Sequence, residues 1–152
     1  MDDFAELVER FLQAPKRCVN RSIRWRTGNH PDYAVARLRL LADGFEGYRT
    51  RVEMAAHLKR DPRKFQFALL FNNTRVLALD VGPARSHKNL LTGKSISCSH
   101  WQVYPLYEAE ADDRTLTHRI WLDEFCKRAH IDLEAPYRQP PFDKVQLGLS
   151  LK

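Results

Sequence analysis

Charged and apolar residues alternate one by one through several stretches of the chain, and this alternation constrains the fold more than any other feature. The stretch AVARLRLL places Arg37 and Arg39 between small and branched apolar residues. The stretches CVNRSIRWRT and YRTRVEMA show a similar alternation. A period of two puts successive side chains on opposite faces of a strand. The pattern predicts half-buried antiparallel strands with a basic outer face.

The same period continues beyond the basic turn KRDPRK. Apolar residues recur at every second position over 65–71 and stop at Asn72-Asn73. Asparagine tolerates positive φ, so this pair predicts a tight hairpin into a strand over 76–80. A further strand is expected over 96–107. Alternating residues over 145–151 predict one more edge strand.

Two helices are expected outside these strands. Apolar residues recur three and four positions apart over 4–12, and Pro15 ends this pattern, which predicts a helix over 3–14. A second stripe over 121–129 predicts a helix near 117–130. The chain is therefore expected to be a single α+β domain over 1–152, with a curved antiparallel sheet of about six strands and helices on one face.

Other classes of protein are not indicated. Strands and helices do not alternate, and no G-x-G-x-x-G motif follows a strand, so a nucleotide-binding α/β fold is excluded. The C-terminal segment 134–152 is Pro-rich and extended in character. No apolar stretch is long enough to span a membrane. The three cysteines are far apart and none lies in a C-x-x-C pair, so neither a disulfide framework nor a zinc site is indicated. We therefore expect a cytoplasmic protein with no membrane association and no cofactor.

The net charge of +6 is concentrated in the middle of the chain. Residues 16–94 hold 17 Lys and Arg against six Asp and Glu, a net +11, whereas both ends are acidic. Such asymmetry favours a nucleic acid, or a protein complex that handles nucleic acid, as the partner. Solvated strand faces are the simpler explanation. The cations expected to bind are Arg24, Arg26, Arg37, Arg39, Arg49, Arg51, Arg85 and Lys88.

Polar residues cluster around the long loop 81–95. Asp80 ends one predicted strand, His87 and Asn89 lie in the loop, and His100 lies on the next strand. Metal-free RNA cleavage needs a base, an acid and cations on the phosphate, and histidine suits both proton roles. Tyr104 is a further candidate proton donor.

Simpler explanations exist for each of these residues. His100 beside a tryptophan fits a packed, hydrogen-bonded histidine, and Asp80 fits a turn cap. Asn89 fits a loop position with positive φ. Two histidines and a carboxylate (His87, His100 and Asp80) could also bind a metal ion, but their spacing is not diagnostic and no metal is predicted.

A resemblance adds to these patterns. The runs LLFNNTRVLALDVGPARSHKN, SHWQVYP and LDEFCKRAHIDL resemble a family of small uncharacterised bacterial and phage proteins. Members show a strand ending in Leu-Asp, a loop His-x-Asn and a strand His-x-His-x-Tyr. The resemblance covers residues 65–133 and places Asp80, His87, Asn89, His100 and Tyr104 on the motif positions. Gln102 stands where the pattern has its second histidine.

The resemblance implies a bacterial or mobile-element origin in a toxin, defence or counter-defence setting, without an established activity. The main hypothesis is a basic protein that acts on or around nucleic acid through an arginine-rich sheet face. One alternative is a metal-independent ribonuclease that uses His87 and His100. The other is a non-enzymatic inhibitor that binds an acidic protein surface.

Overall fold

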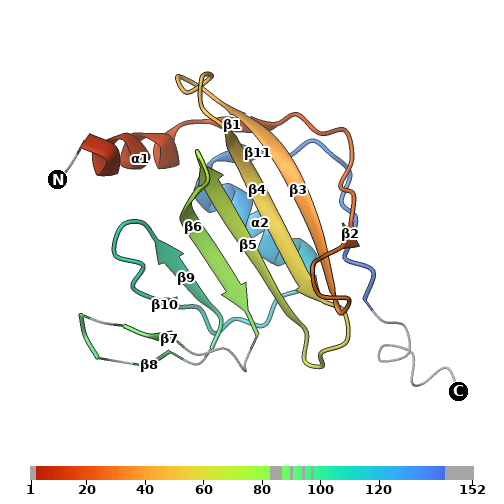
Figure 1. Ribbon diagram of the computed structural model, residues 1–152. Coiled ribbons are helices and arrows are strands. Elements are labelled where there is room, and N and C mark those ends of the chain that lie inside the picture. Colours follow the sequence, from red (N-terminus) through yellow and green to blue (C-terminus); the bar gives the residue numbers. More distant parts are fainter. Residues whose placement is uncertain (1–2, 83–86, 90, 94, 97, 143–152) are drawn as a thin grey trace, which may run out of the picture.

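The protein has the α+β architecture that the sequence predicts. A computed structural model describes residues 3–82, 87–89, 91–93, 95–96 and 98–142, with the backbone alone for 87–88 and 95–96. Its described part contains two helices, α1 (Asp3–Gln13) and α2 (His118–Ala129), and a large open sheet (Figure 1). Neither helix has the length and apolar character that a membrane crossing requires.

The sheet is larger than expected. Its nine strands run in the order β10-β9-β6-β5-β4-β3-β1-β11, with β2 paired to β3, where the sequence predicted about six. All pairs are antiparallel except β1 with β11. The additional strands are two or three residues long, which is too short for a visible period. The strand bounds are β1 Lys16–Cys18, β2 Arg26–Thr27, β3 Tyr33–Ala42, β4 Thr50–His57, β5 Lys64–Phe71, β6 Thr74–Val81, β9 His100–Val103, β10 Glu110–Ala111 and β11 Ile131–Asp132.

Two of the four long strands, β3 and β4, confirm the period-two prediction, whereas β5 alternates only at its start and β6 is buried throughout from Val76 onward. Along β3 the side chains alternate between buried and partly or fully exposed, so that Arg37 and Arg39 lie on the face opposite Leu38 and Leu40. The hairpin between β5 and β6 also forms as expected: Asn72 and Asn73 have φ values of 48° and 69°.

Three strand predictions differ from the structure. The expected strand over 18–27 is interrupted, since β1 ends at Cys18 and β2 begins at Arg26. The strand expected over 96–107 is confined to β9, with a separate two-stranded sheet of β7 (His87–Lys88) and β8 (Ser95–Ile96) before it. The edge strand expected over 145–151 lies outside the described residues.

Helix α2 covers one face of the sheet and contributes buried side chains to the core on that side (Figure 1). Phe125 of α2 stacks between Phe67 of β5 and Trp101 of β9, with centroid distances of 5.6 and 6.0 Å. Helix α1 adds Phe11 to the same core, 4.6 Å from the ring of Phe71. No described helix covers the opposite face, which we call the open face.

A buried lysine joins the ends of the two helices. Lys16 Nζ donates to the carbonyls of Leu12, Ala14 and Ala129 at 3.2, 2.8 and 2.7 Å. Carbonyls at helix C-termini lack intrahelical partners and carry partial negative charge, so an ammonium is stabilised there. Burial nevertheless lowers the pKa of Lys16 to about 8.

Candidate functional site

Asp80 and His100 are direct cross-strand neighbours on β6 and β9. Their side chains lie on the face opposite α2, and Nε2 of His100 is 3.5 Å from Oδ2 of Asp80. Both residues are nevertheless buried, with exposed fractions of 5% for Asp80 and 2% for His100. The structure therefore brings together two of the five predicted catalytic residues.

The ring of His100 faces an acceptor on each side. Its Nδ1 lies 2.9 Å from the carbonyl oxygen of Cys98, and because a carbonyl only accepts, Nδ1 carries a hydrogen. Its Nε2 faces the carboxylate of Asp80. Both ring nitrogens therefore face groups of the fold itself, whereas a general base needs a nitrogen within reach of its substrate. The geometry thus fits a buried structural pair better than it fits a base.

Asn89 has a structural role in the described contacts. Its Oδ1 accepts the backbone N–H of Ala109 at 2.6 Å, and its Nδ2 donates to the carbonyl of the same residue at 3.1 Å. The buried amide therefore pins the loop after β7 to the segment before β10. At the base of the loop, the N–H of Gly82 donates to Ser99 Oγ at 3.1 Å.

The remaining loop candidates have no described side-chain geometry. His87 and Lys88 pair through their backbone with Ile96 and Ser95, and their side chains lie outside the described part of the structure. Arg85 lies outside the described residues altogether.

Tyr104 is not brought to the Asp80–His100 pair. It follows β9 at the end opposite His100, roughly 13 Å along the chain at the usual rise per strand residue. Its ring packs edge-on against Phe4 of α1 at 5.5 Å. Gln102, which replaces the second histidine of the resembling pattern, donates to the carbonyl of Tyr107 at 2.9 Å.

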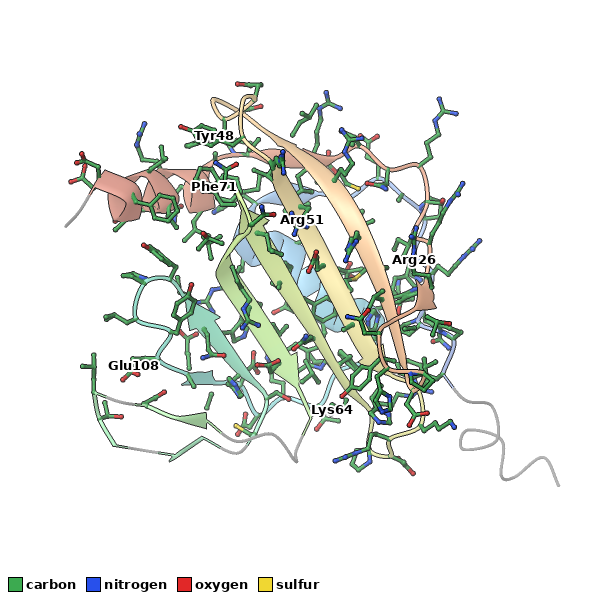
Figure 2. The ribbon with its side chains drawn as sticks, viewed as in Figure 1. Arg26, Tyr48, Arg51, Lys64, Phe71 and Glu108 are labelled. Atoms are coloured by element: carbon green, nitrogen blue, oxygen red, sulfur yellow. The ribbon has the colours of Figure 1, made fainter. Side chains whose placement is uncertain are left out.

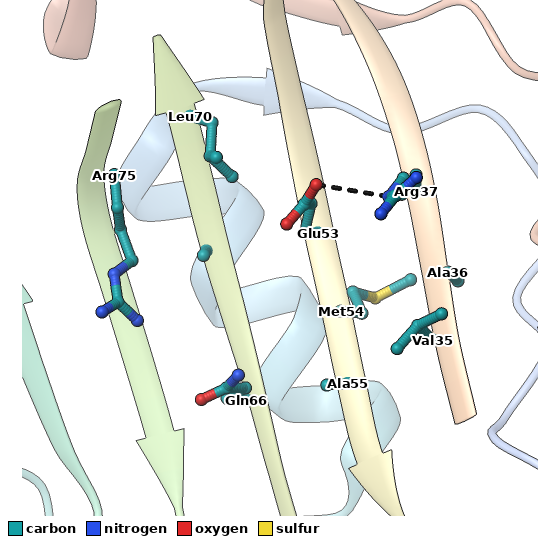
Figure 3. A pocket seen from close by; sticks show the side chains of 10 residues that line it. Val35, Ala36, Arg37, Glu53, Met54, Ala55, Gln66, Leu70 and Arg75 are labelled. Atoms are coloured by element: carbon teal, nitrogen blue, oxygen red, sulfur yellow. Dashed lines mark ion pairs between the residues drawn. The ribbon is translucent and has the colours of Figure 1, made fainter. Parts of the chain in front are cut away.

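The predicted arginines gather on the open face. Arg39 of β3 and Arg51 of β4 are direct cross-strand partners, and Arg37 is opposite Glu53 in the same pair of strands. Glu53 lies between two arginines: its Oε2 forms an ion pair with Nε of Arg37 at 3.3 Å (Figure 3) and accepts a hydrogen bond from Nε of Arg51 at 2.8 Å. Arg51 is further held by Asn73 Oδ1 at 2.9 Å.

Arg24 and Arg26 extend this surface beyond β3. Both are exposed, and together with Arg37 they line a hollow of about 150 Å³ between the β2 segment and β3. In Figure 2 Arg26 lies on the side of β3 away from Arg51. Arg49 precedes β4 and is exposed, with its N–H bonded to Asn72 Oδ1.

Two further hollows adjoin this one on the open face. The central hollow, of about 300 Å³, has Ala55, Gln66 and Ala68 in its floor and Arg75 of β6 at one side (Figure 3). A third hollow of about 360 Å³ shares Ala55 and Gln66 and extends to Lys64. The three hollows share lining residues and lie next to one another on this face, and we refer to them together as the face groove.

Sequence reasoning missed most of the groove floor. Gln66 and the alanines carry no motif from which the sequence could assign them to a site. The available signal was that small residues lie on the same face of neighbouring strands. This can be seen only when the strand register is known, which pairs Glu53 with Ala68 and Leu70 with Arg75.

Metal ligands do not gather in the described part of the chain: no three His, Cys, Asp or Glu side chains there could hold an ion. The metal hypothesis included His87, whose side chain is outside that part.

Comparisons with known proteins add no assignment. The chain matches no protein-family model, no curated protein and no solved structure. The resemblance to small bacterial and phage proteins therefore stays a prediction. Function has to be inferred from the open face and its groove.

Proposed function

We propose that the protein binds nucleic acid along the open face of its sheet. One observation carries this proposal: cations on this face outnumber the carboxylates that could neutralise them. Glu53 is shared by Arg37 and Arg51. Four more arginines of this face form no ion pair with any described residue: Arg24, Arg26, Arg39 and Arg75.

Two arginines on the α2 side of the sheet are matched by carboxylates. Arg114 pairs with Asp112 at 2.7 Å and with Glu124 at 2.8 Å, and Arg128 pairs with Glu110 at 3.0 Å. The Arg114 guanidinium lowers the pKa of Asp112 to about 2. Arg114 and Arg128 are therefore neutralised within the fold, unlike the four arginines of the open face that form no ion pair with a described residue.

Guanidinium groups suit phosphate ligands for two reasons. They present donors in a planar fork that fits phosphate oxygens, and they keep their charge at any physiological pH. Each phosphate that an arginine neutralises also releases condensed counterions, which favours binding at low salt. The proposed setting is bacterial or phage toxin, defence or counter-defence biology in the cytoplasm, with a nucleic-acid-handling complex as an alternative partner.

The test is a salt titration with matched charge variants. We expect a labelled oligonucleotide to bind the wild type with an affinity that falls steeply as NaCl rises, measured by fluorescence polarisation. Arg26→Gln/Arg39→Gln should weaken binding and lower the slope of log affinity against log salt by roughly 0.7–0.9 for each phosphate that the variant no longer neutralises.

The control removes the same charge from the opposite side of the molecule. Arg119 and Lys127 are exposed on α2, so Arg119→Gln/Lys127→Gln changes the net charge equally while leaving the open face intact. Equal weakening by both double variants, or no salt-sensitive binding by the wild type, would contradict the proposal. In the latter case an acidic protein becomes the better partner.

RNA cleavage by His87 and His100 is a second candidate. It has one supporting observation, the pairing of His100 with Asp80 across β6 and β9. The burial of His100 and its two acceptors favour a role in holding the strands together.

A further inference from the structure

The face groove ends in an aromatic recess next to the turn between β2 and β3. Its walls come from this turn, from β3 and from the start of β5, and its volume is about 360 Å³. The residues that matter for the argument are Gly28, His30, Tyr33, Lys64 and Gln66.

Tyr33 is the centre of an aromatic cluster at this recess. Its ring lies 4.8 Å from the ring of His57 and 5.8 Å from that of His30, in edge-to-face arrangements. The two histidine rings hold Tyr33 in place, and Tyr33 remains partly exposed. Burial lowers the pKa of His57; the Asp32 carboxylate opposes this shift, and the nearby Arg60 and Lys64 add to it.

The backbone leaves this recess open. Gly28 has no side chain, and a Cβ there would lie 3.2 Å from Val35 and 3.6 Å from Cβ of Tyr33. The position is held against β3 by the Gly28 N–H, which donates to the carbonyl of Tyr33 at 2.8 Å. A larger residue at Gly28 would therefore crowd the wall beside Tyr33.

Cations adjoin the recess on both sides. Lys64 lies at its rim, and Arg37 follows Tyr33 by four residues on β3, roughly 13 Å away at the usual rise per strand residue. Arg26 is the direct cross-strand partner of Val35, between these two positions. One short polynucleotide could therefore contact the arginines and the recess together.

We propose that the open face binds single-stranded nucleic acid, with one unpaired base stacked on Tyr33 and the adjoining phosphates on Arg26 and Arg37. This inference rests on the proposed function and specifies its substrate. A planar base offers a π-face to an aromatic ring whatever its sequence, so the recess selects for unpaired bases and not for a particular one. In a duplex both faces of each internal base are already stacked, and only the phosphates remain available.

The experiment compares single-stranded with duplex oligonucleotides, and the wild type with variants that each lack one aromatic side chain. We expect a single-stranded oligonucleotide, tested as oligo(U) and as oligo(dT), to bind more tightly than a duplex of the same length. Tyr33→Leu should weaken single-strand binding roughly 5- to 100-fold, the range for the loss of one stacked base, and leave duplex binding unchanged. Comparing the RNA with the DNA oligonucleotide shows whether the 2′-hydroxyl contributes.

Tyr48→Leu is the matched control. Tyr48 is 38% exposed and stacks on Phe71, at the end of the sheet opposite Lys64 (Figure 2). This variant should bind as the wild type does. Ala55→Leu is a second test, because Ala55 lies in the floor of both larger hollows and the substitution fills the groove without changing charge. It should weaken single-strand binding, with circular dichroism confirming the fold.

Inorganic polyphosphate separates failure of this inference from failure of the proposed function. It carries the charge but no bases, so it should bind wild type and Tyr33→Leu equally and bind Arg26→Gln/Arg39→Gln more weakly. Equal affinity for single strands and duplex, with no effect of Tyr33→Leu, would overturn the stacking site alone. Absence of salt-sensitive binding to any of these polyanions would overturn the proposed function as well.

Discussion

His118, the first residue of α2, is buried in an aromatic environment. Its ring lies 4.8 Å from Phe65, 5.1 Å from Phe67 and 5.7 Å from Trp25, and its Nδ1 is 2.6 Å from the hydroxyl of Tyr137. Its Nε2 has no hydrogen-bond partner among the described residues. Burial, with a smaller contribution from the nearby Arg63 charge, lowers the pKa of His118 to about 3. The residue is therefore a neutral part of the core at pH 7.

This burial predicts acid sensitivity of a defined size. Between pH 6.5 and about 3 the unfolded chain takes up a proton on His118 that the folded protein does not. The free energy of unfolding should therefore decrease as the pH is lowered through this range. His118 alone should contribute a decrease of up to about 1.4 kcal/mol for each pH unit. Urea unfolding of the wild type and of His118→Phe at several pH values measures this effect. Any excess in the free energy of unfolding of the wild type over the variant should narrow or reverse as the pH is lowered.

His130→Asn is the control for this prediction. His130 is exposed and ends α2 with φ of 58°, a conformation that asparagine also adopts. A stability difference between wild type and His118→Phe that does not change with pH would show that His118 has the same pKa in the folded and unfolded states.

At the scale of elements, the Asp80–His100 pair joins β6 to β9. Beyond β9 the sheet continues only into the short β10, so this strand has few other pairing contacts on its outer side. Removal of one partner leaves the other charge buried, which typically costs about 3–5 kcal/mol. We expect Asp80→Asn and His100→Gln each to destabilise the protein by about 3–5 kcal/mol in urea unfolding. The double variant should cost less than the sum of the two.

The same variants address the ribonuclease alternative. If the pair is structural, His100→Gln should leave binding of single strands near the wild-type value at a temperature where the variant is folded. If His100 acts as a general acid or base, wild type should cleave RNA in the presence of EDTA, and His100→Ala and His87→Ala should each lower the rate by roughly 10²–10⁴. Cleavage with that response would assign the pair to catalysis.

At the scale of the molecule, one sheet face holds cations that repel one another. Arg24, Arg26, Arg37 and Arg39 lie around neighbouring strands. Moderate salt screens such charges over about 10 Å, and a polyanion would neutralise them directly. We therefore expect the Tm of the free protein to rise with NaCl and with polyphosphate, measured by scanning calorimetry.

The double variant Arg26→Gln/Arg39→Gln provides the comparison. It should have a higher Tm than the wild type at low salt and a smaller response to both additives. An equal salt response in the two proteins would mean that the open-face arginines do not repel one another measurably.

Several elements of this fold follow from local sequence alone. The spacing of apolar residues in α1 and α2, the alternation along β3 and β4 and the asparagine pair at the hairpin all act within a few residues. The basic outer face follows as well, because parity along a strand assigns each arginine to one side. These features were predictable since each depends on neighbours in the chain.

Features that depend on pairing between segments distant in sequence were decided by the tertiary structure. The stretch 19–25 alternates like a strand, yet Asn20 Oδ1 accepts the N–H of Arg39 at 2.6 Å and Ile23 is buried in the core, so the chain leaves the sheet and returns as β2. A side chain that hydrogen-bonds to the backbone of β3 competes with backbone pairing of another strand along that edge. Sequence alone does not show which of the two forms.

The candidate sites depend on the same kind of information. The contact of Asp80 with His100, the alanine floor of the groove and the position of Tyr33 beside the arginines all require a register between strands distant in sequence. A shift of one residue in any pairing would move these side chains to the other face. The sequence by itself therefore determined the two helices, the long strands and their charged side. The pairing of distant strands and the packing of the sheet against α1 and α2 determined the short strands and which side chains meet.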